Sequence, residues 1–419
     1  MPVDGWPPDQ GADAPLLLSA SHPFPPDARR IGVAVSGGGD SMALLHLLHR
    51  AAPHRGFSLS AVTVDHRLRP EAAAEAHAVA RFCAGLGVPH ETLVWDHGAI
   101  QGNVMDEARR ARISLISAWA RAKGIGHVAL GHTADDRAEG FLMGLGRASG
   151  LDGLTGLRPF WREAGVWWGR PLLLHGRQEL RAYLTRHGIG WIDDPTNEDD
   201  RFARIRARRA LAALAPLGIT IDRLATTIDA LTEARRALEA ATKAAAARMD
   251  CAAGALRIGQ QDLADLPREI RRRLLTAAIR WMGGADYPPR EAKVAHLLEA
   301  LDEGRDATLG GVRFRSRKGG VSITREPRAA CGPVAIGQVW DHRWQVEGPD
   351  LPGAHVAALG AEGLRQVADW RQSGLARDVL AVTPAIWQGK RLIAAPSCEK
   401  TGQWRATCCP SFVTFILSD

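Results

Sequence analysis

The hexapeptide Ser36-Gly37-Gly38-Gly39-Asp40-Ser41 lies between the apolar run Ile31–Val35 and the helical pattern Met42–His49. This order predicts a strand, a glycine turn and the start of a helix. Three glycines let the backbone approach an anion closely, and the N–H groups and dipole of a helix start attract phosphate oxygens. Asp40 adds a carboxylate that could hold Mg²⁺ against a nucleotide. The hexapeptide matches neither GxxxxGK(S/T) nor GxGxxG, the two common phosphate loops.

The chain has 419 residues, enough for roughly two to four domains. Its 46% hydrophobic and 24% charged residues are typical of a folded protein, and its net charge of +7 is compatible with nucleic acid. The six cysteines include no CxxC pair, which argues against a zinc knuckle and favours the reducing cytoplasm. No apolar run approaches about 20 residues, so we expect no membrane span. Residues 1–30, rich in Pro and Asp, are predicted to be a loose leader.

Short apolar runs alternate with helical patterns from residue 31 to residue 130. The runs are Ile31–Val35, Leu59–Val64, Glu91–Trp95 and His127–Leu130, and the helical patterns are Met42–His49, Glu71–Leu86 and Asn103–Lys123. This alternation predicts an α/β fold, a Rossmann-like parallel sheet with helices on both faces and ligands at the carboxyl ends of the strands. The glycine loop, Asp65-His66 and Gly131-His132 each follow a predicted strand, so we expect them at one edge of the sheet.

The pattern changes downstream of the predicted sheet. Residues 221–249 have the apolar period of a long helix, a second helical stretch carries arginines from Arg268 to Arg273, and Thr308–Ile323 is predicted to form a hairpin. We therefore predict domain boundaries near 215 and 330. They give a catalytic domain over 31–215, a helical domain over 216–330 and a small α+β domain over 331–419.

A second cluster of chemical interest is the segment Gly131–Glu139. If a helix begins near Thr133, His132 precedes it, and Asp136 and Glu139 share one face. Two carboxylates there could hold magnesium or bind a cationic amine. The alternative is a solvated helix whose acidic residues only complement the dipole at its start. The expected position beside the glycine loop favours a site.

Two groups of arginines could bind phosphate. On the predicted helix 103–123, Arg109 and Arg112 share one face, and Arg112 is a candidate for the triphosphate because guanidinium groups pair bidentately with oxyanions. The five arginines from Arg201 to Arg209 could form an ordinary solvated helix face. With only Asp199-Asp200 nearby, we interpret them as an electropositive ridge for RNA phosphates.

Together these motifs resemble the bacterial tRNA(Ile)-lysidine synthetase family, within the ATP-pyrophosphatase, or PP-loop, superfamily. SGGxDS alone is typical of the superfamily, whereas the ordered series of motifs is typical of the family. The series comprises Ser36–Ser41, Val64–Arg69, Asn103, Ala108-Arg109, Ala111-Arg112, Gly131–Glu139, Arg147–Leu154, Arg170–Leu173, Asp194–Asp199, Tyr287–Arg290 and Thr308–Gly311. The resemblance implies a PP-loop fold of the adenine nucleotide alpha hydrolase-like type.

The resemblance implies a ligase that modifies the wobble cytidine of the CAU anticodon of an isoleucine tRNA. ATP adenylates the carbon-2 oxygen of cytosine and releases pyrophosphate, and the ε-amine of free L-lysine then attacks carbon 2 as AMP leaves. This chemistry suits the residues, because a poor leaving oxygen becomes a good one while cations neutralise the pyrophosphate. The implied partners are tRNA(Ile), L-lysine and ATP with Mg²⁺, in the cytoplasm and away from membranes, and a homodimer is left open.

The resemblance also implies roles for individual residues. Asp40 is expected at Mg²⁺ and the pyrophosphate, and Arg112 and His132 at the phosphates and the adenylated intermediate. Asp136 and Glu139 are expected at the lysine substrate. The residues expected to bind the nucleotide are Ser36, Gly37, Gly38, Gly39, Asp40, Ser41, Asp65 and His66. The residues expected to bind tRNA are Arg201, Arg204, Arg206 and Arg208, with the domain over 216–330.

Other interpretations remain open. The positions that depart from the family pattern lie beside the motifs, and they are Met105, Ile113, Gly140, Gly144 and Ile205. A tRNA thiolation enzyme of the same superfamily is a second interpretation, although such enzymes usually use paired cysteines and the catalytic half contains Cys83 alone. A third is a non-catalytic RNA-binding protein with a vestigial nucleotide fold. Loss of Asp40, Asp136 or Glu139 would favour it, and all three are present.

Overall fold

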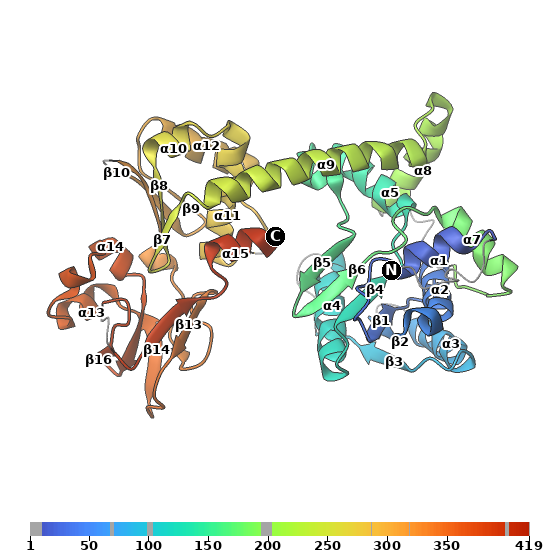
Figure 1. Cartoon of the computed structure of the whole chain (residues 1–419), viewed down its shortest axis with the longest axis horizontal. Coiled ribbons are helices and arrows are strands. Elements are labelled where there is room, and N and C mark those ends of the chain that lie inside the picture. The colour runs from blue at the N-terminus through green and yellow to red at the C-terminus, as the bar shows by residue number, and fades with distance from the viewer. Residues whose placement is uncertain are drawn as a thin grey trace. The chain divides into compact units, whose positions relative to one another are not determined.

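The computed structural model describes residues 11–67, 71–98, 104–193, 203–285, 287–317, 319–398 and 402–418. The chain divides into two compact units, Met1–Arg235 and Arg236–Asp419, and Figure 1 labels their elements. The helices of the first unit are α1 (Ala14–Ser21), α2 (Gly39–Arg55), α3 (Ala72–Gly85), α4 (Val104–Ala122), α5 (Ala134–Leu145), α6 (Leu151–Thr155), α7 (Arg177–Arg186) and α8 (Ala203–Leu214). The division falls within α9 (Ile221–Ala246).

The first unit is built on a six-stranded sheet of order β3-β2-β1-β4-β6-β5. The strands are β1 (Arg30–Ala34), β2 (Ser58–Asp65), β3 (His90–Val94), β4 (His127–Leu130), β5 (Phe160–Glu163) and β6 (Val166–Gly169). Neighbours run parallel except at β5, which pairs antiparallel with β6. The predicted strands and the parallel α/β sheet are confirmed, and β5 and β6 are additions to them.

The register of β1 brings the predicted motifs to one edge. Ala34, the last residue of β1, pairs with Val62 of β2 and with Leu130, the last residue of β4. The glycine loop, Asp65-His66 and Gly131-His132 therefore all emerge at the carboxyl ends of adjacent strands, which is where ligands bind in sheets of this kind.

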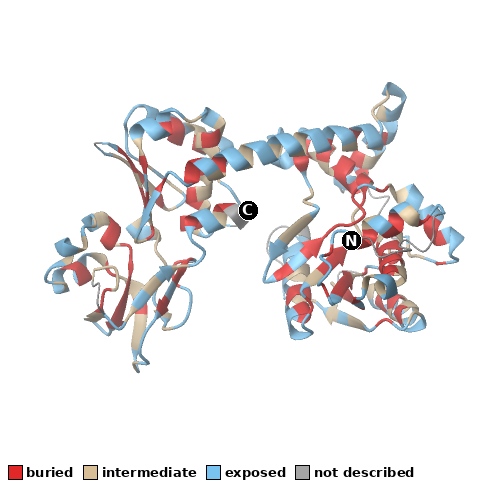
Figure 2. Ribbon diagram, in the orientation of Figure 1, coloured by how far each residue is buried: buried red, intermediate tan, exposed pale blue. Residues whose placement is uncertain are grey.

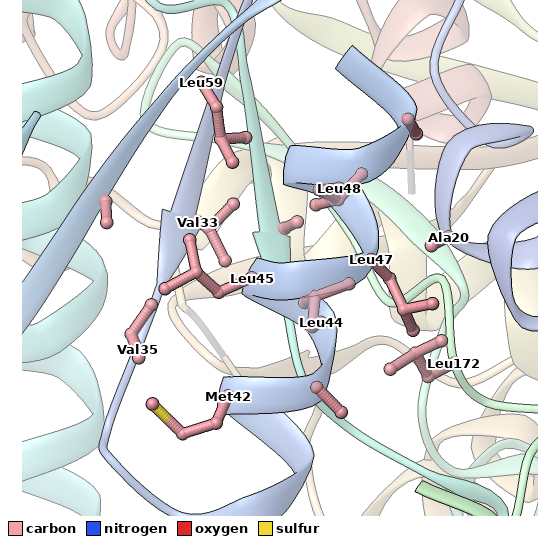
Figure 3. Close-up of a cluster of buried hydrophobic side chains, with 14 of the residues drawn as sticks. Ala20, Val33, Val35, Met42, Leu44, Leu45, Leu47, Leu48, Leu59 and Leu172 are labelled. Atoms are coloured by element: carbon pink, nitrogen blue, oxygen red, sulfur yellow. The ribbon is translucent and has the colours of Figure 1, made fainter. Parts of the chain in front are cut away.

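Helices cover both faces of the sheet, because the strands carry apolar residues on each side. On one face, Val33 packs with Leu45 of α2 in a fully buried cluster (Figure 3). On the other face, Val128 packs with Trp119 of α4. Gly32 of β1 permits this second contact, since a β-carbon there would lie 2.9 Å from the Trp119 ring. Figure 2 shows that the central strands and the inner side of α2 are largely buried.

Part of the predicted leader belongs to the core. Leu16 and Leu17 of α1 are fully buried, and α1 packs on α2. Asp13, just before α1, pairs with three side chains, those of Arg50, Arg186 and His187. The described residues of this stretch are therefore not a loose leader, because the run Leu16–Leu18 has an apolar partner surface and Asp13 has cationic partners. Residues 1–10 lie outside the described residues.

The second unit contains antiparallel sheets and short helices. Its strands are β7 (Asp250–Ala252), β8 (Ala255–Gly259), β9 (Ala307–Leu309), β10 (Val312–Arg317), β11 (Gly320–Arg325), β12 (Val334–Ala335), β13 (Trp344–Glu347), β14 (Ala354–Ala358), β15 (Pro384–Gln388), β16 (Arg391–Ala394) and β17 (Arg405–Cys408). Its helices are α10 (Gln260–Ala264), α11 (Arg268–Gly283), α12 (Glu291–Asp302), α13 (Gly360–Gln366), α14 (Arg377–Leu380) and α15 (Phe412–Ser418).

A five-stranded sheet of order β7-β8-β11-β10-β9 forms the first part of this unit. The predicted hairpin is confirmed as β10 and β11, which pair antiparallel. Phe314 of β10 packs with Leu274 and Ile279 of α11 in a buried core. The prediction of a helical domain over 216–330 is therefore incomplete. Strands β8, β10 and β11 form a sheet, and their apolar residues pack against one face of the helices.

The last part of the second unit combines a sheet of order β12-β14-β15-β16, the pair β13-β17 and the short helices α13 and α14, which is the α+β character expected there. Among the described residues no single helix is long and apolar enough to cross a membrane, and only the bent pair 203–217 and Ile221–Ala246, taken together, meets that criterion by length and composition.

Candidate active site

The glycine loop makes a closed turn between β1 and α2. Gly37 has a φ of 88°, a left-handed conformation that glycine adopts without strain. The Ser41 hydroxyl accepts a hydrogen bond from the N–H of Ser36 at 3.1 Å and donates one to the Gly38 carbonyl at 2.9 Å. Gly38 is the N-cap of α2, a helix of 17 residues. The N–H groups and the positive dipole end of α2 are thus directed at the loop, where phosphate oxygens are favoured.

Gly131, at the end of β4, lies against the start of α2. A β-carbon on Gly131 would come within 2.9 Å of the Asp40 carbonyl oxygen, of the Ser41 α-carbon and of the Ser41 nitrogen. Because these are backbone atoms, they cannot rotate away. Only glycine therefore lets β4 pass this close to the loop, and His132 follows directly after the contact.

The acidic helix α5 begins at the same edge. Thr133 is its N-cap, and both the N–H and the hydroxyl of Thr133 donate to Oδ2 of Asp136, at 2.9 and 3.0 Å. One oxygen of Asp136 thus has the capping role considered as an alternative from the sequence. The other oxygen lies 3.8 Å from Nη1 of Arg204. Burial alone would raise the pKa of Asp136, but the hydrogen bond from the Thr133 N–H and the positive charge of Arg204 favour the carboxylate and lower this pKa.

One guanidinium joins the glycine loop to the acidic helix. Arg177, the first residue of α7, places Nε 3.2 Å from Oδ2 of Asp40 and Nη1 3.4 Å from Oε1 of Glu139. Arg208 of α8 adds a second cation, with Nε 3.0 Å from the same Glu139 oxygen. The backbone N–H of Arg177 also donates to Oδ2 of Asp135 at 2.7 Å, which anchors the start of α7 to α5.

The ion pairs of Arg177 with Asp40 and Glu139 shift the pKa values of the groups at this site. Burial alone would lower the pKa of Arg177, but the carboxylates of Asp40 and Glu139 outweigh it and raise this pKa. Burial raises the pKa of Asp40, and Arg177 offsets part of that effect. Asp40 is therefore a carboxylate that gains from a nearby cation, since a positive charge stabilises its ionised form.

Several buried atoms of the site have no hydrogen-bond partner among the described residues. They are Asp40 Oδ1, Glu139 Oε2, Arg112 Nε and His66 Nδ1. Buried polar atoms in folded proteins are nearly always paired, so these four atoms are available to a ligand, an ion or water. Two of them are carboxylate oxygens and one is a guanidinium nitrogen, which suits a ligand that carries both cationic and anionic groups.

The site also contains the guanidinium of Arg112 and two imidazoles, those of His66 and His132. The pKa of Arg112, on α4, is lowered by burial and by neighbouring arginines. Burial, followed by the charge of Arg112, lowers the pKa of His66. Burial, followed by the charge of Arg170, lowers the pKa of His132 to about 3. Both imidazoles are therefore neutral near pH 7, while Arg112 supplies the positive charge for phosphate.

Most of the predicted site residues are brought to this edge. Asp65 ends β2, and its Oδ1 accepts the N–H of Arg67 at 2.8 Å, a turn contact. Arg204 and Arg208 contact the acidic pair, while Arg206 is exposed on α8. Arg201 lies outside the described residues, as do Asn103 and Asp194–Asp199 of the motif series.

Arg177, Asp135 and Arg170 are site residues to which the sequence pattern assigns no role. Arg177 and Asp40 are 137 positions apart in the sequence, and Arg177 has the pattern of an ordinary residue at a helix start. Arg170 stands in a quoted motif without a role, yet its Nε donates to Nδ1 of His132 at 3.1 Å. The signal that could have found it is its position directly after an apolar run at the sheet edge.

The fold and the loop define a PP-loop protein, and the PP-loop domain family matches residues 17–215. Similar proteins identify the family of this chain more narrowly. The chain is 45% identical over 382 residues to the tRNA(Ile)-lysidine synthase of Ruegeria pomeroyi, covering 90% of this chain and 91% of that protein. It is 38% identical to that of Hyphomonas neptunium, covering 73% and 83%, and 36% identical to that of Rhizobium meliloti, covering 85% and 82%. The chain therefore belongs to the tRNA(Ile)-lysidine synthase family.

Proposed function

We propose that this protein converts the wobble cytidine of the CAU anticodon of tRNA(Ile) to lysidine. ATP adenylates the base with release of pyrophosphate, and free L-lysine displaces AMP. The observation that carries the proposal is the Arg177 guanidinium, which joins Asp40 of the glycine loop to Glu139 of the acidic helix. The phosphate loop and the carboxylates that suit a cation are thus both in contact with the same side chain. The extent of the match to the Ruegeria pomeroyi enzyme supports the same substrates.

In the nucleotide half, Asp40 fits a magnesium ion. Its Oδ1 is buried without a partner among the described residues, and Mg²⁺ is usually held by one or two carboxylates together with substrate phosphates. When bound, the ion would neutralise the departing pyrophosphate. The N–H groups at the start of α2 hold the phosphates, and Arg112 adds a fixed positive charge.

In the amine half, Glu139 and Asp136 suit the lysine substrate. Glu139 is almost fully buried at 1% exposure, and its Oε2 lacks a partner among the described residues. Asp136 has one oxygen in the helix cap, and Glu139 has one oxygen on the two arginines, so each carboxylate offers its other oxygen to an ammonium group. Arg177 and Arg208 both pair with Oε1 of Glu139, so Oε2 is the oxygen left to accept from the ammonium group.

The second step needs a proton acceptor, because only the neutral amine attacks carbon 2. The amine nitrogen bonds to carbon 2, the bond from carbon 2 to the phosphate-bearing oxygen breaks, and AMP leaves with the electron pair. The amine proton passes to a carboxylate such as Asp136 or to a phosphate oxygen. His132 and Arg112 lie at the phosphates and the adenylated intermediate in this proposal.

For tRNA, we assign phosphate contacts to α8 and to the second unit. Arg204 and Arg208 reach tRNA or phosphate from their positions at the acidic pair, and Arg206 does so from the exposed face of α8. In the second unit, a groove of about 540 Å³ is lined by Arg313, Arg315, Arg317 and Arg377. Asp378 pairs with Arg315 at 2.6 Å, so the excess charge of the groove is positive. RNA phosphates favour such a surface.

A thiolation enzyme is less well supported. Cys83 of α3, the single cysteine of the first unit, is fully buried in an apolar cluster, and burial raises its pKa to about 11. A thiol that is buried and protonated cannot carry sulfur to a substrate.

The proposal is tested with purified protein, ATP, MgCl₂, L-lysine and a transcript of CAU-anticodon tRNA(Ile). Pyrophosphate and AMP are measured separately, and the nucleosides are analysed by mass spectrometry. We expect AMP formation to require lysine and the product nucleoside to carry the lysine mass. A transcript with uridine at the wobble position is the control. AMP release that ignores lysine, or nucleosides without an adduct, would exclude lysidine formation.

A further inference from the structure

Arg170 holds one side of the His132 imidazole. Its Nε donates to Nδ1 of His132 at 3.1 Å, and its Nη1 donates to the carbonyl of Arg158 at 2.6 Å. The guanidinium carbon lies 4.0 Å from the centre of the Trp161 ring. Arg170 is 7% exposed, and its backbone N–H donates to the carbonyl of Pro159. The hydrogen bonds at the edge of the guanidinium group, the Trp161 ring on its face and the backbone hydrogen bond of Arg170 thus fix the direction in which Nε points.

The chemistry of this contact fixes a proton on His132. A guanidinium group donates hydrogen bonds and accepts none, and it stays protonated in proteins. Nδ1 of His132 must therefore be the acceptor and carry no proton. A neutral imidazole has one N–H, so that proton is on Nε2. Among the described residues the one side-chain hydrogen bond of His132 is the bond from Arg170 to Nδ1, which leaves the N–H at Nε2 for a ligand.

We propose that Arg170 is a positioning residue that holds His132 as the Nε2–H tautomer, so that His132 acts on the reaction as a hydrogen-bond donor and not as its base. This inference rests on the proposed function, in which the ligand at His132 is the phosphate of the adenylated base. A donor at that place stabilises the negative oxygens of the AMP group as it leaves. The proton of the attacking amine then goes to a carboxylate or a phosphate oxygen.

The surroundings of His132 keep the ring neutral. The charged groups that face it are Arg170 after β6, Asp136 on α5, Arg112 on α4 and Arg204 on α8. Three of the four are cations, and burial acts in the same direction as their charge, so protonation of Nδ1 is disfavoured. Of these four described groups, Asp136 alone opposes the other three, and its Oδ2 is engaged by Thr133.

The direct test is ¹⁵N NMR of the free full-length protein with labelled histidine, with the His132→Gln spectrum used for assignment. We expect His132 to show a protonated Nε2 and an unprotonated Nδ1, unchanged from pH 8 to pH 5. In Arg170→Met, we expect the two tautomers to mix and the ring to titrate closer to pH 6.5. Arg170→Lys should restore the wild-type tautomer, because an ammonium group also only donates. Arg162→Met, which removes an arginine that lies over Trp167, is the matched control.

The kinetic test measures lysine-dependent AMP release. A glutamine side chain can place an N–H near the position of Nε2, whereas asparagine is too short. We therefore expect His132→Gln to retain activity within about 10-fold and His132→Asn to lose about 100-fold or more. Arg170→Met should lose about 10-fold to 100-fold and gain an inflection near pH 6.

A wild-type spectrum with the proton on Nδ1, or an Arg170→Met protein with the wild-type spectrum and pH profile, would overturn the proposal. The spectra do not depend on the identity of the substrates. If they are as expected but no lysidine forms, the proposed function is wrong and the tautomer assignment stands. If lysidine forms but Nδ1 carries the proton, the proposed function stands and the tautomer assignment is wrong.

Discussion

Gly131 lies so close to Ser41 that a β-carbon on the glycine would come within 2.9 Å of the serine nitrogen and α-carbon. We expect Gly131→Ala to displace the loop from β4, with a destabilisation of about 1–3 kcal/mol and a rise in the KM for ATP. Gly126→Ala is the matched control, because a β-carbon at Gly126, just before β4, would meet nothing within 4 Å. Denaturant unfolding and ATP titration of both variants check the prediction. Equal behaviour of the two variants would contradict the packing argument.

Replacing Asp40 by Asn should remove the carboxylate charge and keep the side-chain shape. We expect pyrophosphate release to fall by at least about 100-fold, because the charge at the buried Oδ1 is lost. The unfolding midpoint should change little. Asp222→Asn, at the start of α9, is a control with the same residue type near a helix start. If Asp40→Asn released pyrophosphate at the wild-type rate, Asp40 would have no part in ATP activation.

Glu139→Gln is expected to weaken lysine binding more than ATP binding. Loss of the charge removes an ionic hydrogen bond to the substrate, so the KM for lysine should rise by about 10-fold to 100-fold with a small change in the KM for ATP. Glu107→Gln, on the exposed side of α4, is the control. Steady-state kinetics with each substrate varied in turn separate the two effects. A selective rise in the KM for ATP would place Glu139 in the nucleotide half instead.

Stability should fall as the pH is lowered from about 6.5 to about 4. Burial, together with the charge of His187, lowers the pKa of His46 to about 4, and its Nδ1 lies 2.6 Å from the Tyr183 hydroxyl. Between these pH values the unfolded chain binds a proton at His46 that the folded chain does not, so protons favour unfolding. We expect His46 to account for roughly 1–3 kcal/mol of the loss. Urea unfolding at several pH values should give a smaller slope for His46→Gln, and equal slopes would refute this account.

Asp13→Asn should loosen α1. Asp13 is 5% exposed and pairs with the side chains of Arg50, Arg186 and His187, so loss of its charge removes the carboxylate that these three groups share. We expect a destabilisation of about 1–3 kcal/mol and faster proteolysis near α1. Asp27→Asn, at an exposed position in the same stretch, serves as the comparison. A wild-type melting temperature for Asp13→Asn would mean that α1 is held by Leu16 and Leu17 alone.

The central sheet could be predicted from the sequence, because β1, β2, β3 and β4 coincide with apolar runs bounded by turn residues. Strands β5 and β6 could not, since each has four residues, β5 ends in the charged residues Arg162 and Glu163, and the apolar run of β6 is short. Helix α1 is also hidden. It has eight residues in a Pro-rich stretch, and its stability comes from packing on α2 rather than from its own propensity.

The candidate site could be predicted where its residues follow a strand directly. Asp40, His132 and Asp136 are of this kind, because the topology of a parallel sheet brings strand ends together. Arg177 could not be predicted in this way, because its contacts with Asp40 and Glu139 depend on where α7 is positioned after a long connection. No pattern near Arg177 distinguishes it from an exposed arginine at a helix start.

The position of Arg177 between Asp40 and Glu139 has a thermodynamic consequence. The two carboxylates share one counter-ion, so a cation that binds at either of them changes how strongly Arg177 is held at the other. Binding equilibria that draw on a shared counter-ion are linked, and the linkage is reciprocal. In the proposed function, binding of the nucleotide at Asp40 and binding of the amine at Glu139 would therefore each change the affinity for the other by the same factor.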